Sequence, residues 1–370
     1  MSDSFRIPPD IVCLSDYEAH ARARLADAAW AYIAGGAADE LTLRRNRAAY
    51  DDIRLNGRVL TCFDGAGGTR LDLFGDSHDH PILLAPVAHH GLACPAAEIA
   101  TAVGAGGARA GFVVSTLSDT PVEEIAAAAR SPFWFQLYIQ HDRAFTRALV
   151  ARAERAGARA IVVTVDAPVS GVRNREQRAG FPEGMPGEAV HLRGLAPPPV
   201  SHAGLGESLL FGGFLAGAPC WEDVAALRAA TRLPLLVKGI MAPEDADRAI
   251  RAGADGIVVS NHGGRVLDTL PATVEVLPAI AAVVAGRVPL LVDGGIRRGT
   301  DVLKALALGA TAVLIGRPYV FALAVAGPAG VAHAVQILRG EFEIAMALTG
   351  CRSLADIGPQ ALWTPTARGG

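Results

Sequence analysis

The sequence predicts a (β/α)8 (TIM) barrel, and three observations carry this prediction. Eight short apolar segments recur between residues 81 and 317. Most are separated by alanine-rich stretches with acidic starts and glycine stops, a pattern typical of helices. The apolar segments are nearly continuous rather than alternating, as in parallel strands buried on both faces. Eight strand–helix units fit a closed barrel, and an open, doubly wound sheet is the alternative.

The predicted strands begin near residue 81 and run in order through the chain. The first four are PILLAPVA (81–88), GFVVST (111–116), FWFQLY (133–138) and AIVVTVD (160–166). The second four are LPLLVKG (233–239), GIVVSN (256–261), VPLLVDGG (288–295) and AVLIGR (312–317). The predicted helices between them include residues 121–130, 143–157, 242–254 and 297–310.

The whole chain, residues 1–370, is predicted to form a single domain. Residues 1–80 are interpreted as N-terminal helices with a small cap, residues 81–350 as the barrel, and residues 351–370 as a C-terminal tail. The connection after the fourth strand is far too long for a simple crossover, and its middle is rich in Gly and Pro. Long irregular insertions in compact domains are often lids, so residues 167–220 are predicted to be an insertion or lid loop.

Composition narrows the class of protein. The chain is 51% hydrophobic and 19% charged with a formal net charge of −3, which is ordinary for a soluble globular protein. No basic excess or basic run suggests nucleic acid or a membrane surface as a partner. The start of the chain lacks the pattern of a signal peptide, and residues 208–219 are too short and glycine-rich to span a bilayer. A cytoplasmic protein without a firm membrane anchor is expected.

The cysteines also indicate a reducing compartment such as the cytoplasm. Five are spread along the chain without a CxxC pair, so free thiols in a reducing compartment are expected rather than a disulfide framework. The same spacing makes a zinc site improbable, and no metal site is predicted.

Polar or ionisable residues end almost every predicted strand. In a barrel, the carboxyl ends of the strands form one rim, where the reacting site lies. A single such residue is explained by a cap or a turn, but the whole set on one rim indicates a site. The strand-end residues, most of them polar or ionisable, are Pro86, Val87, Ala88, Ser115, Gln136, Tyr138, Thr164, Asp166, Lys238, Ser260, His262, Asp293, Gly294, Gly295, Arg297, Gly316 and Arg317.

Two of the strand ends carry more specific signals. After the sixth strand, "VVSNHGGRVLD" (258–268) places His262 and Arg265 on a glycine-rich turn, where a ligand can approach closely. Taken alone, this turn is better explained as a solvated surface turn. After the seventh and eighth strands, "DGGIRRGTD" and "GRP" supply glycine amides, a helix N-terminus and arginines for a phosphate. Glycine pairs that serve only tight turns are the alternative there.

These motifs resemble those of the FMN-dependent 2-hydroxy acid oxidase and dehydrogenase family. "SNHGGRVLD", "LVKGI", "TVDAP", "FQLY", "DGGIRRGTDVLKALALGA" and "IGRP" match in order, from "AYIAGGAADELTLRRNRAAYD" near the start to "MALTGCRSL" near the end. The resemblance implies tightly bound, non-covalent FMN and oxidation of a small (S)-2-hydroxy acid to the 2-oxo acid. It also suggests a homotetramer.

The resemblance implies a role for each matching residue. His262 would be the general base, and Asp166 would hold its other ring nitrogen and stabilise the imidazolium. Arg265 would bind the substrate carboxylate with its planar fork. Two tyrosines, Tyr32 and Tyr138, would contact the carboxylate and the hydroxyl. Arg173, on the long insertion, would be a second arginine that swings over the substrate.

The remaining matches would hold the cofactor. Lys238 would lie beside the flavin edge on which negative charge gathers. Side chains of Ser115, Gln136 and Thr164 would hydrogen-bond the ring, with the backbone of Pro86, Val87 and Ala88 on its far side. The phosphate would lie near the amides of Gly295 and Gly316 and the guanidiniums of Arg297 and Arg317. Without the family match, Tyr32 would be explained as a packed helix residue and Lys238 as a surface lysine. The other matching cofactor positions are Ser260, Asp293 and Gly294.

Three departures from the family pattern bear on the substrate. Val266 stands where glutamine is common, and Leu117 stands where glycolate oxidases have tryptophan. His89 is unusual, and it is interpreted either as lining the substrate entrance or as a rim histidine. The smaller Leu117 favours a bulky or aromatic hydroxy acid.

Several alternatives stay open at this point. Oxygen is the expected electron acceptor, and a quinone or another protein is the alternative. Electrons can leave the substrate by a carbanion or a hydride route. A phosphate-binding barrel isomerase without flavin, and a catalytically silent flavoprotein, are competing functions.

Overall fold

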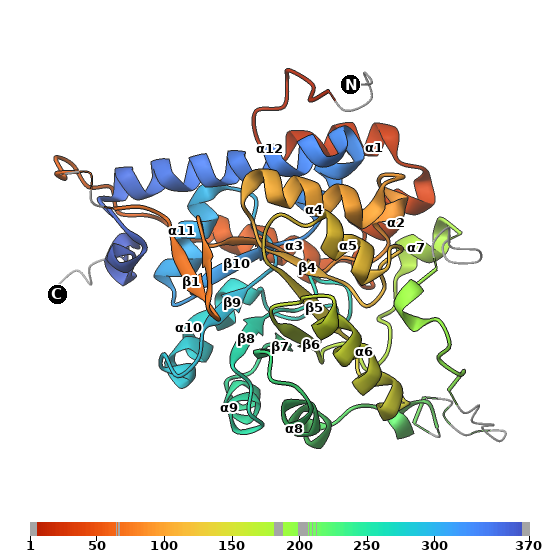
Figure 1. Cartoon of the computed structure of the whole chain (residues 1–370). Helices are drawn as coiled ribbons and strands as arrows, with labels where there is room; N and C mark the ends of the chain where they lie inside the picture. Colours follow the sequence, from red (N-terminus) through yellow and green to blue (C-terminus); the bar gives the residue numbers. More distant parts are fainter. Residues whose placement is uncertain are drawn as a thin grey trace.

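The computed structural model describes residues 6–63, 65, 67–180, 188–198, 206, 208, 210–211 and 213–364. Eight parallel strands form a closed barrel in the order β10-β3-β4-β5-β6-β7-β8-β9, with helices around it (Figure 1). This confirms the predicted barrel and excludes the open sheet. The strands are β3 (Ile82–Leu84), β4 (Phe112–Val114), β5 (Phe133–Leu137), β6 (Ile161–Thr164), β7 (Leu235–Ile240), β8 (Gly256–Val259), β9 (Leu290–Val292) and β10 (Ala312–Ile315).

All eight strands lie within or overlap the predicted segments, but most are shorter at the carboxyl end. The fourth predicted strand, for example, reaches residue 166, whereas β6 ends at Thr164. Polar side chains of the rim therefore come both from the last residues of the strands and from the residues that follow them. A continuous apolar run therefore predicts a strand better than it predicts where the strand ends.

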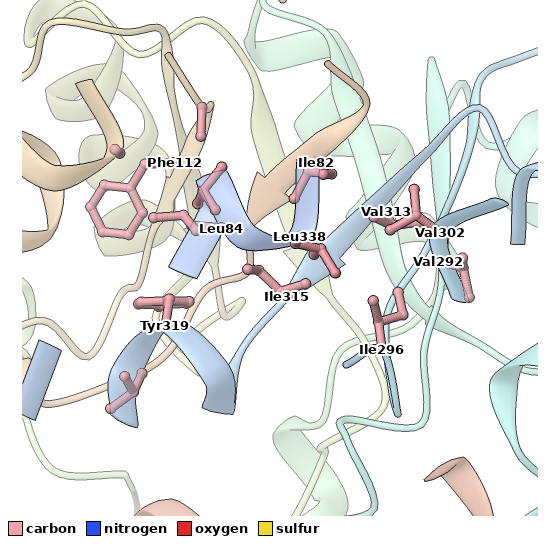
Figure 2. Close-up of a cluster of buried hydrophobic side chains, with 14 of the residues drawn as sticks. Ile82, Leu84, Phe112, Val292, Ile296, Val302, Val313, Ile315, Tyr319 and Leu338 are labelled. Carbon is pink, nitrogen blue, oxygen red and sulfur yellow. The ribbon is translucent and has the colours of Figure 1, made fainter. Parts of the chain in front are cut away.

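Side chains alternate between the inside and the outside of the barrel, as the pleat of a strand requires. The inward-facing layer is a separate buried cluster that includes Leu83, Val113, Trp134, Val162, Leu236, Val258, Leu291 and Leu314. The outward-facing residues pack against the helices. Figure 2 shows part of this outer layer, in which Ile82, Leu84 and Ile315 lie near Tyr319 and Leu338 of the last helix, and Val313 lies near Val302.

One small sheet precedes the barrel and was not predicted. β1 (Leu71–Leu73) and β2 (Asp76–His78) pair antiparallel, so the prediction that the first strand begins near residue 81 is wrong for the chain, although it holds for the barrel. Leu73 belongs to the inner cluster, and the ring of Phe74 packs edge-on against Trp134 with 5.6 Å between centroids. The hairpin therefore covers the inner layer of the barrel. Strands of only three residues are too short for an alternating pattern to be recognised.

The helices follow the expected pattern. The N-terminal part contributes α1 (Asp16–Arg24), α2 (Asp27–Ala34) and α3 (Leu41–Asp52). At the start of α6, the side chain of Asp142 accepts hydrogen bonds from the amides of Ala144 and Phe145, which caps the helix. The helices around the barrel are α4 (Ala97–Ala108), α5 (Val122–Ala128), α6 (Arg143–Arg155), α8 (Trp221–Ala230), α9 (Pro243–Arg251), α10 (Thr273–Val284) and α11 (Gly299–Ala307).

The last helix, α12 (Arg317–Thr349), is long and apolar enough to cross a membrane by length and composition. It is interrupted at Ala326 and Gly327, whose backbone is not helical. In the most apolar 18-residue stretch of α12, 61% is buried inside the fold. The helix packs against α1, α4 and α11. Packing inside the fold therefore accounts for its apolar character.

The predicted insertion is described only in part. It contains α7 (Asn174–Arg178) and short 3-10 turns at Val190–Leu192 and Phe214–Gly217. The amide of Val190 donates to the carbonyl of Ser118 at 3.1 Å, which ties the insertion to the loop after β4. Residues 181–187, 199–205, 207, 209 and 212 lie outside the described residues, and the lid function stays a prediction.

Candidate active site

A cavity of about 680 Å³ lies at the carboxyl ends of the barrel strands. This volume is in the range of small-molecule and cofactor sites. All but two of the site residues expected from the sequence line it, and the exceptions, Asp166 and Ser260, hydrogen-bond the lining residues His262 and Lys238. Tyr32 of α2 and Arg173 of the insertion complete the wall from outside the barrel.

The pleat of the strands explains why polar side chains point into this cavity. Gln136, Thr164 and Lys238 are inward-facing, each two residues beyond an apolar member of the inner layer. Because side chains two apart on a strand share a face, these three residues form the layer above the apolar one. All three are buried, which sets them apart from ordinary surface residues.

These side chains form a connected row across neighbouring strands. The Gln136 amide nitrogen donates to Thr164 Oγ1 at 3.0 Å, and its carbonyl oxygen accepts from the amide of Thr116 at 3.1 Å. Ser115 Oγ lies 3.4 Å from the same carbonyl oxygen. The predicted flavin-ring residues are thus preorganised as a polar floor to the cavity.

Lys238 is held as an ammonium. Its side chain is only 4% exposed, which excludes the alternative of a surface lysine. Nζ donates to Ser260 Oγ at 2.9 Å and lies 3.2 Å from Asp293 Oδ2. Burial opposes the charge, but Asp293 and Asp166 outweigh it and raise the pKa of Lys238. The other oxygen of Asp293 is buried without a hydrogen-bond partner in the described part of the chain, so a polar ligand group is expected next to it.

His262 and Asp166 form a tight pair beside this lysine. His262 Nδ1 lies 2.8 Å from Asp166 Oδ1, and Nε2 lies 3.4 Å from the hydroxyl of Tyr138. The turn after β8 needs left-handed backbone at His262, Gly263 and Gly264, with φ of 57°, 63° and 74°. The glycines therefore have the conformational function expected from the sequence.

The electrostatics leave His262 able to accept a proton. Burial, reinforced by Lys238 and Arg265, lowers the pKa of His262 against the opposing effect of Asp166. Burial also disfavours the charge of Asp166, but His262 and Lys238 outweigh it and hold its pKa below the usual value. At neutral pH the pair is thus a neutral imidazole hydrogen-bonded to a carboxylate. This is the resting state that a general base requires.

Two arginines share one carboxylate at the mouth of the cavity. Glu176 accepts from Arg265 Nη2 at 3.0 Å with one oxygen and from Arg173 Nη1 at 3.3 Å with the other. The Arg265 guanidinium also lies over the ring of Tyr32, 4.9 Å from its centroid. One positive charge is left uncompensated by this carboxylate, as expected where a ligand carboxylate binds. Glu176 was missed in the sequence, although its place three residues after Arg173 is the signal that could have revealed it.

The predicted phosphate site contains two half-buried guanidiniums. Arg317 donates to the carbonyls of Ile33 (3.0 Å), Gly263 (2.9 Å) and Gly35 (2.6 Å), and Arg297 donates to the carbonyl of Ile296 at 2.9 Å. Across the described residues, neither forms an ion pair with a carboxylate. Burial lowers the pKa of both, which reflects positive charge that lacks a counter-ion. A bound dianion would supply this counter-ion, so these residues fit the phosphate of FMN.

Fold and site together define a flavin-binding oxidoreductase barrel. Residues 21–364 match the model of the FMN-dependent dehydrogenase family, and the chain belongs to this family. It is 47% identical to an L-lactate oxidase of Roseobacter sp. (strain GAI101), covering 95% of this chain and 94% of that protein. It is 40% identical to 2-hydroxyacid oxidase 2 of Mus musculus, over 95% of this chain and 98% of that protein. A crystal structure of mandelate oxidase with (S)-2-phenylpropionate is similar with a TM-score of 0.85 and 41% identity, covering 95% and 98% of the two chains.

The family match supports FMN as the cofactor, and the site residues fit it. The individual roles expected for these residues stay predictions, because positions alone do not test them. In the described part of the chain, no group of three or more His, Cys, Asp or Glu side chains could hold a metal ion.

Proposed function

We propose that this protein is an FMN-dependent oxidase that converts an (S)-2-hydroxy acid into the corresponding 2-oxo acid. Membership of the FMN-dependent dehydrogenase family supports the cofactor, and relatives named as 2-hydroxy acid and L-lactate oxidases support the reaction class. The observation that carries the proposal is the 2.8 Å His262–Asp166 pair, which faces one cavity with Arg265, Arg173 and two tyrosines. Such a cavity offers a base, a carboxylate site and a hydroxyl site together.

The residues of the chain bind and orient the substrate. Arg265, assisted by Arg173 and the hydroxyl of Tyr32, would hold the substrate carboxylate in a bidentate geometry. The hydroxyl of Tyr138 lies 3.4 Å from His262 Nε2, so a substrate hydroxyl bound to Tyr138 would lie next to the base. Positioning of this kind turns a bimolecular encounter into an oriented reaction.

His262 Nε2 would then accept a proton from the substrate. Asp166 would stabilise the imidazolium that results, because its carboxylate already accepts the hydrogen bond from Nδ1. Bound FMN would supply the two-electron oxidising chemistry, with oxygen as the proposed final acceptor. Lys238 would hold its positive charge beside the cofactor throughout, since Asp293 and Asp166 keep it protonated.

Flavin reduction without oxygen tests the proposal. The FMN-loaded protein is mixed anaerobically with (S)-lactate, glycolate, (S)-2-hydroxyoctanoate and (S)-mandelate, and the visible flavin absorbance is followed. At least one acid should bleach the flavin, and admission of air should restore its colour with formation of hydrogen peroxide. A barrel isomerase would give no bleaching with any acid. A bleached enzyme that air does not reoxidise would instead require a quinone or protein acceptor.

The substrate side chain is proposed to be branched, long or aromatic rather than that of glycolate. Leu117 lines the cavity where a larger residue would fill it, and apolar side chains of Ile139, Val165 and Leu192 line it as well. Burial of apolar substrate surface against such a wall contributes about 25 cal/mol per Å². Mandelate oxidase, to which the chain is similar, is named for an aromatic acid of this kind, whereas L-lactate oxidase is named for an acid with a small side chain.

The protein is also proposed to lie in the cytoplasm and to form a homotetramer. The five cysteines are all free thiols, which supports the cytoplasm as a reducing compartment. A homotetramer is supported by the family resemblance, and sedimentation or light scattering of the purified protein would test it.

A further inference from the structure

A second His–Asp pair lies in the wall of the same cavity. His89, in the loop after β3, has its Nδ1 2.8 Å from Asp119 Oδ1, in the loop after β4. This is the same distance as in the His262–Asp166 pair, and both histidines have left-handed backbone, with φ of 56° at His89. Such backbone is uncommon for residues other than glycine, and it is often found at functional sites.

The two loops are fixed so that this pair keeps its geometry. Glu98 Oε1 accepts hydrogen bonds from the amides of His90 and Asp119, both at 3.2 Å. The amide of His89 donates to the carbonyl of Leu117 at 3.1 Å. The other Asp119 oxygen accepts from the amide of Gly91 at 2.8 Å. The imidazole is therefore held in place from both sides before any ligand binds.

Asp119 leaves one ring nitrogen of His89 for a ligand. The His89 side chain is only 3% exposed, yet it lines the cavity, and Nε2 has no hydrogen-bond partner among the residues that the structure describes. Because His89 lines the cavity, Nε2 can hydrogen-bond a polar ligand group that enters it. The ring also lies edge-on to Tyr32, with 6.1 Å between centroids. Nε2 is thus available next to the residues expected to hold the substrate carboxylate.

We infer that His89, positioned by Asp119, binds a hydroxyl group on the substrate side chain. This inference rests on the proposed function and names a substrate class for it: 2-hydroxy acids with a further hydroxyl group. A hydroxyl both donates and accepts hydrogen bonds, so it fits Nε2 whether His89 is neutral or charged. A second carboxylate fits less well, because it only accepts and because the Asp119 carboxylate lies directly behind the ring.

Matched substrate pairs test this assignment. (S)-Lactate is compared with (S)-glycerate, and (S)-mandelate with its 4-hydroxy derivative, so that each pair differs by one hydroxyl. The ratio of kcat/KM within a pair isolates the contribution of that hydroxyl from changes in cavity size. Dissociation constants of the products pyruvate and hydroxypyruvate, measured from the flavin spectrum, give a binding readout that needs no turnover.

Two variants remove the ring nitrogen with opposite side effects. His89→Asn tolerates the left-handed backbone but shortens the side chain, whereas His89→Phe keeps the ring volume but strains the backbone. In at least one pair the wild type should prefer the hydroxylated acid, and both variants should reduce that ratio about five- to tenfold, the range of one hydrogen bond. If His89 binds the extra hydroxyl of glycerate rather than that of 4-hydroxymandelate, the preference for hydroxypyruvate over pyruvate should fall together with the kcat/KM ratio. Asp119→Asn should lower the same ratio, chiefly through KM.

The control is the surface pair His20–Asp10, whose atoms lie 2.9 Å apart outside the cavity. His20→Phe should leave every ratio unchanged. A wild type without hydroxyl preference in either pair, or ratios in both His89 variants within twofold of the wild type, would overturn the inference. Failure of the proposed function would look different, because no acid would then bleach the flavin at all, while the binding of the two products could still be compared.

Discussion

Replacement of Asp166 by asparagine is the most informative change in the predicted catalytic pair. Asp166→Asn keeps the shape of the side chain but removes the charge that accepts the hydrogen bond from His262 Nδ1 at 2.8 Å. The asparagine amide can also donate to Nδ1, which would place the ring proton on Nε2 and block the base. Lys238 keeps its ion pair with Asp293 at 3.2 Å, so the positive charge of Lys238 still has a counter-ion in the variant.

The expected loss can be worked from the geometry. Charge centres of an imidazolium and a carboxylate in this contact are about 4 Å apart, and at an effective dielectric constant of about 20 they attract by about 4 kcal/mol. Because each 1.4 kcal/mol corresponds to about tenfold in rate, loss of this attraction should slow substrate oxidation by about a thousandfold. The side chains of both residues are at most 20% exposed, so solvent screening is limited.

The assay is the rate of anaerobic flavin reduction at saturating substrate in a stopped-flow instrument. FMN content, measured after release of the cofactor, should be unchanged in Asp166→Asn. Asp10→Asn is the matched control, since it removes a carboxylate from the exposed His20–Asp10 pair. Reduction of the Asp166→Asn enzyme within tenfold of the wild-type rate, with FMN bound, would refute the stabilising role assigned to Asp166.

Three further predictions follow from the same site. Arg265→Lys should lower kcat/KM about 10- to 100-fold, mainly through KM, because a point charge replaces a fork that binds a carboxylate; an unchanged KM would contradict this. Leu117→Trp should lower kcat/KM for (S)-mandelate relative to glycolate by at least about tenfold, because an indole would overfill the cavity. A ranking that does not change, or a wild type that prefers glycolate, would show that the steric argument is wrong. The base must be neutral, and the pKa of His262 is lowered, so kcat/KM should fall with decreasing pH only below the ordinary histidine value of about 6.5. An acidic limb centred above pH 7 would contradict this assignment.

The barrel could be predicted because its strands lie in short, continuous apolar runs that recur eight times along the chain. Every strand end that carries a polar residue was therefore placed on the correct rim. The β1–β2 sheet was missed, since its strands, LDL and DSH, are interrupted by polar residues and do not form the apolar runs that mark the barrel strands.

The partners of the site residues were harder to predict. Glu176 lies on α7 and Asp119 in the loop after β4. The spacing of Glu176 from Arg173 indicates one of its contacts, but nothing in the local sequence shows that Glu176 also meets Arg265 or that Asp119 meets His89. The position of His89 also depended on the structure. From the sequence it was equally well a rim residue, whereas the fold buries it in the cavity wall.

The anaerobic reaction of a His262→Ala enzyme tests the central claim most directly. The variant should retain FMN, because the expected phosphate ligands and Lys238 are untouched, but (S)-2-hydroxy acids should reduce its flavin roughly 10²- to 10⁴-fold more slowly than in the wild type. Loss of rate with retained cofactor is the result that the His262–Asp166 pair predicts. Near-normal flavin reduction by His262→Ala would contradict the assignment of His262 as the base.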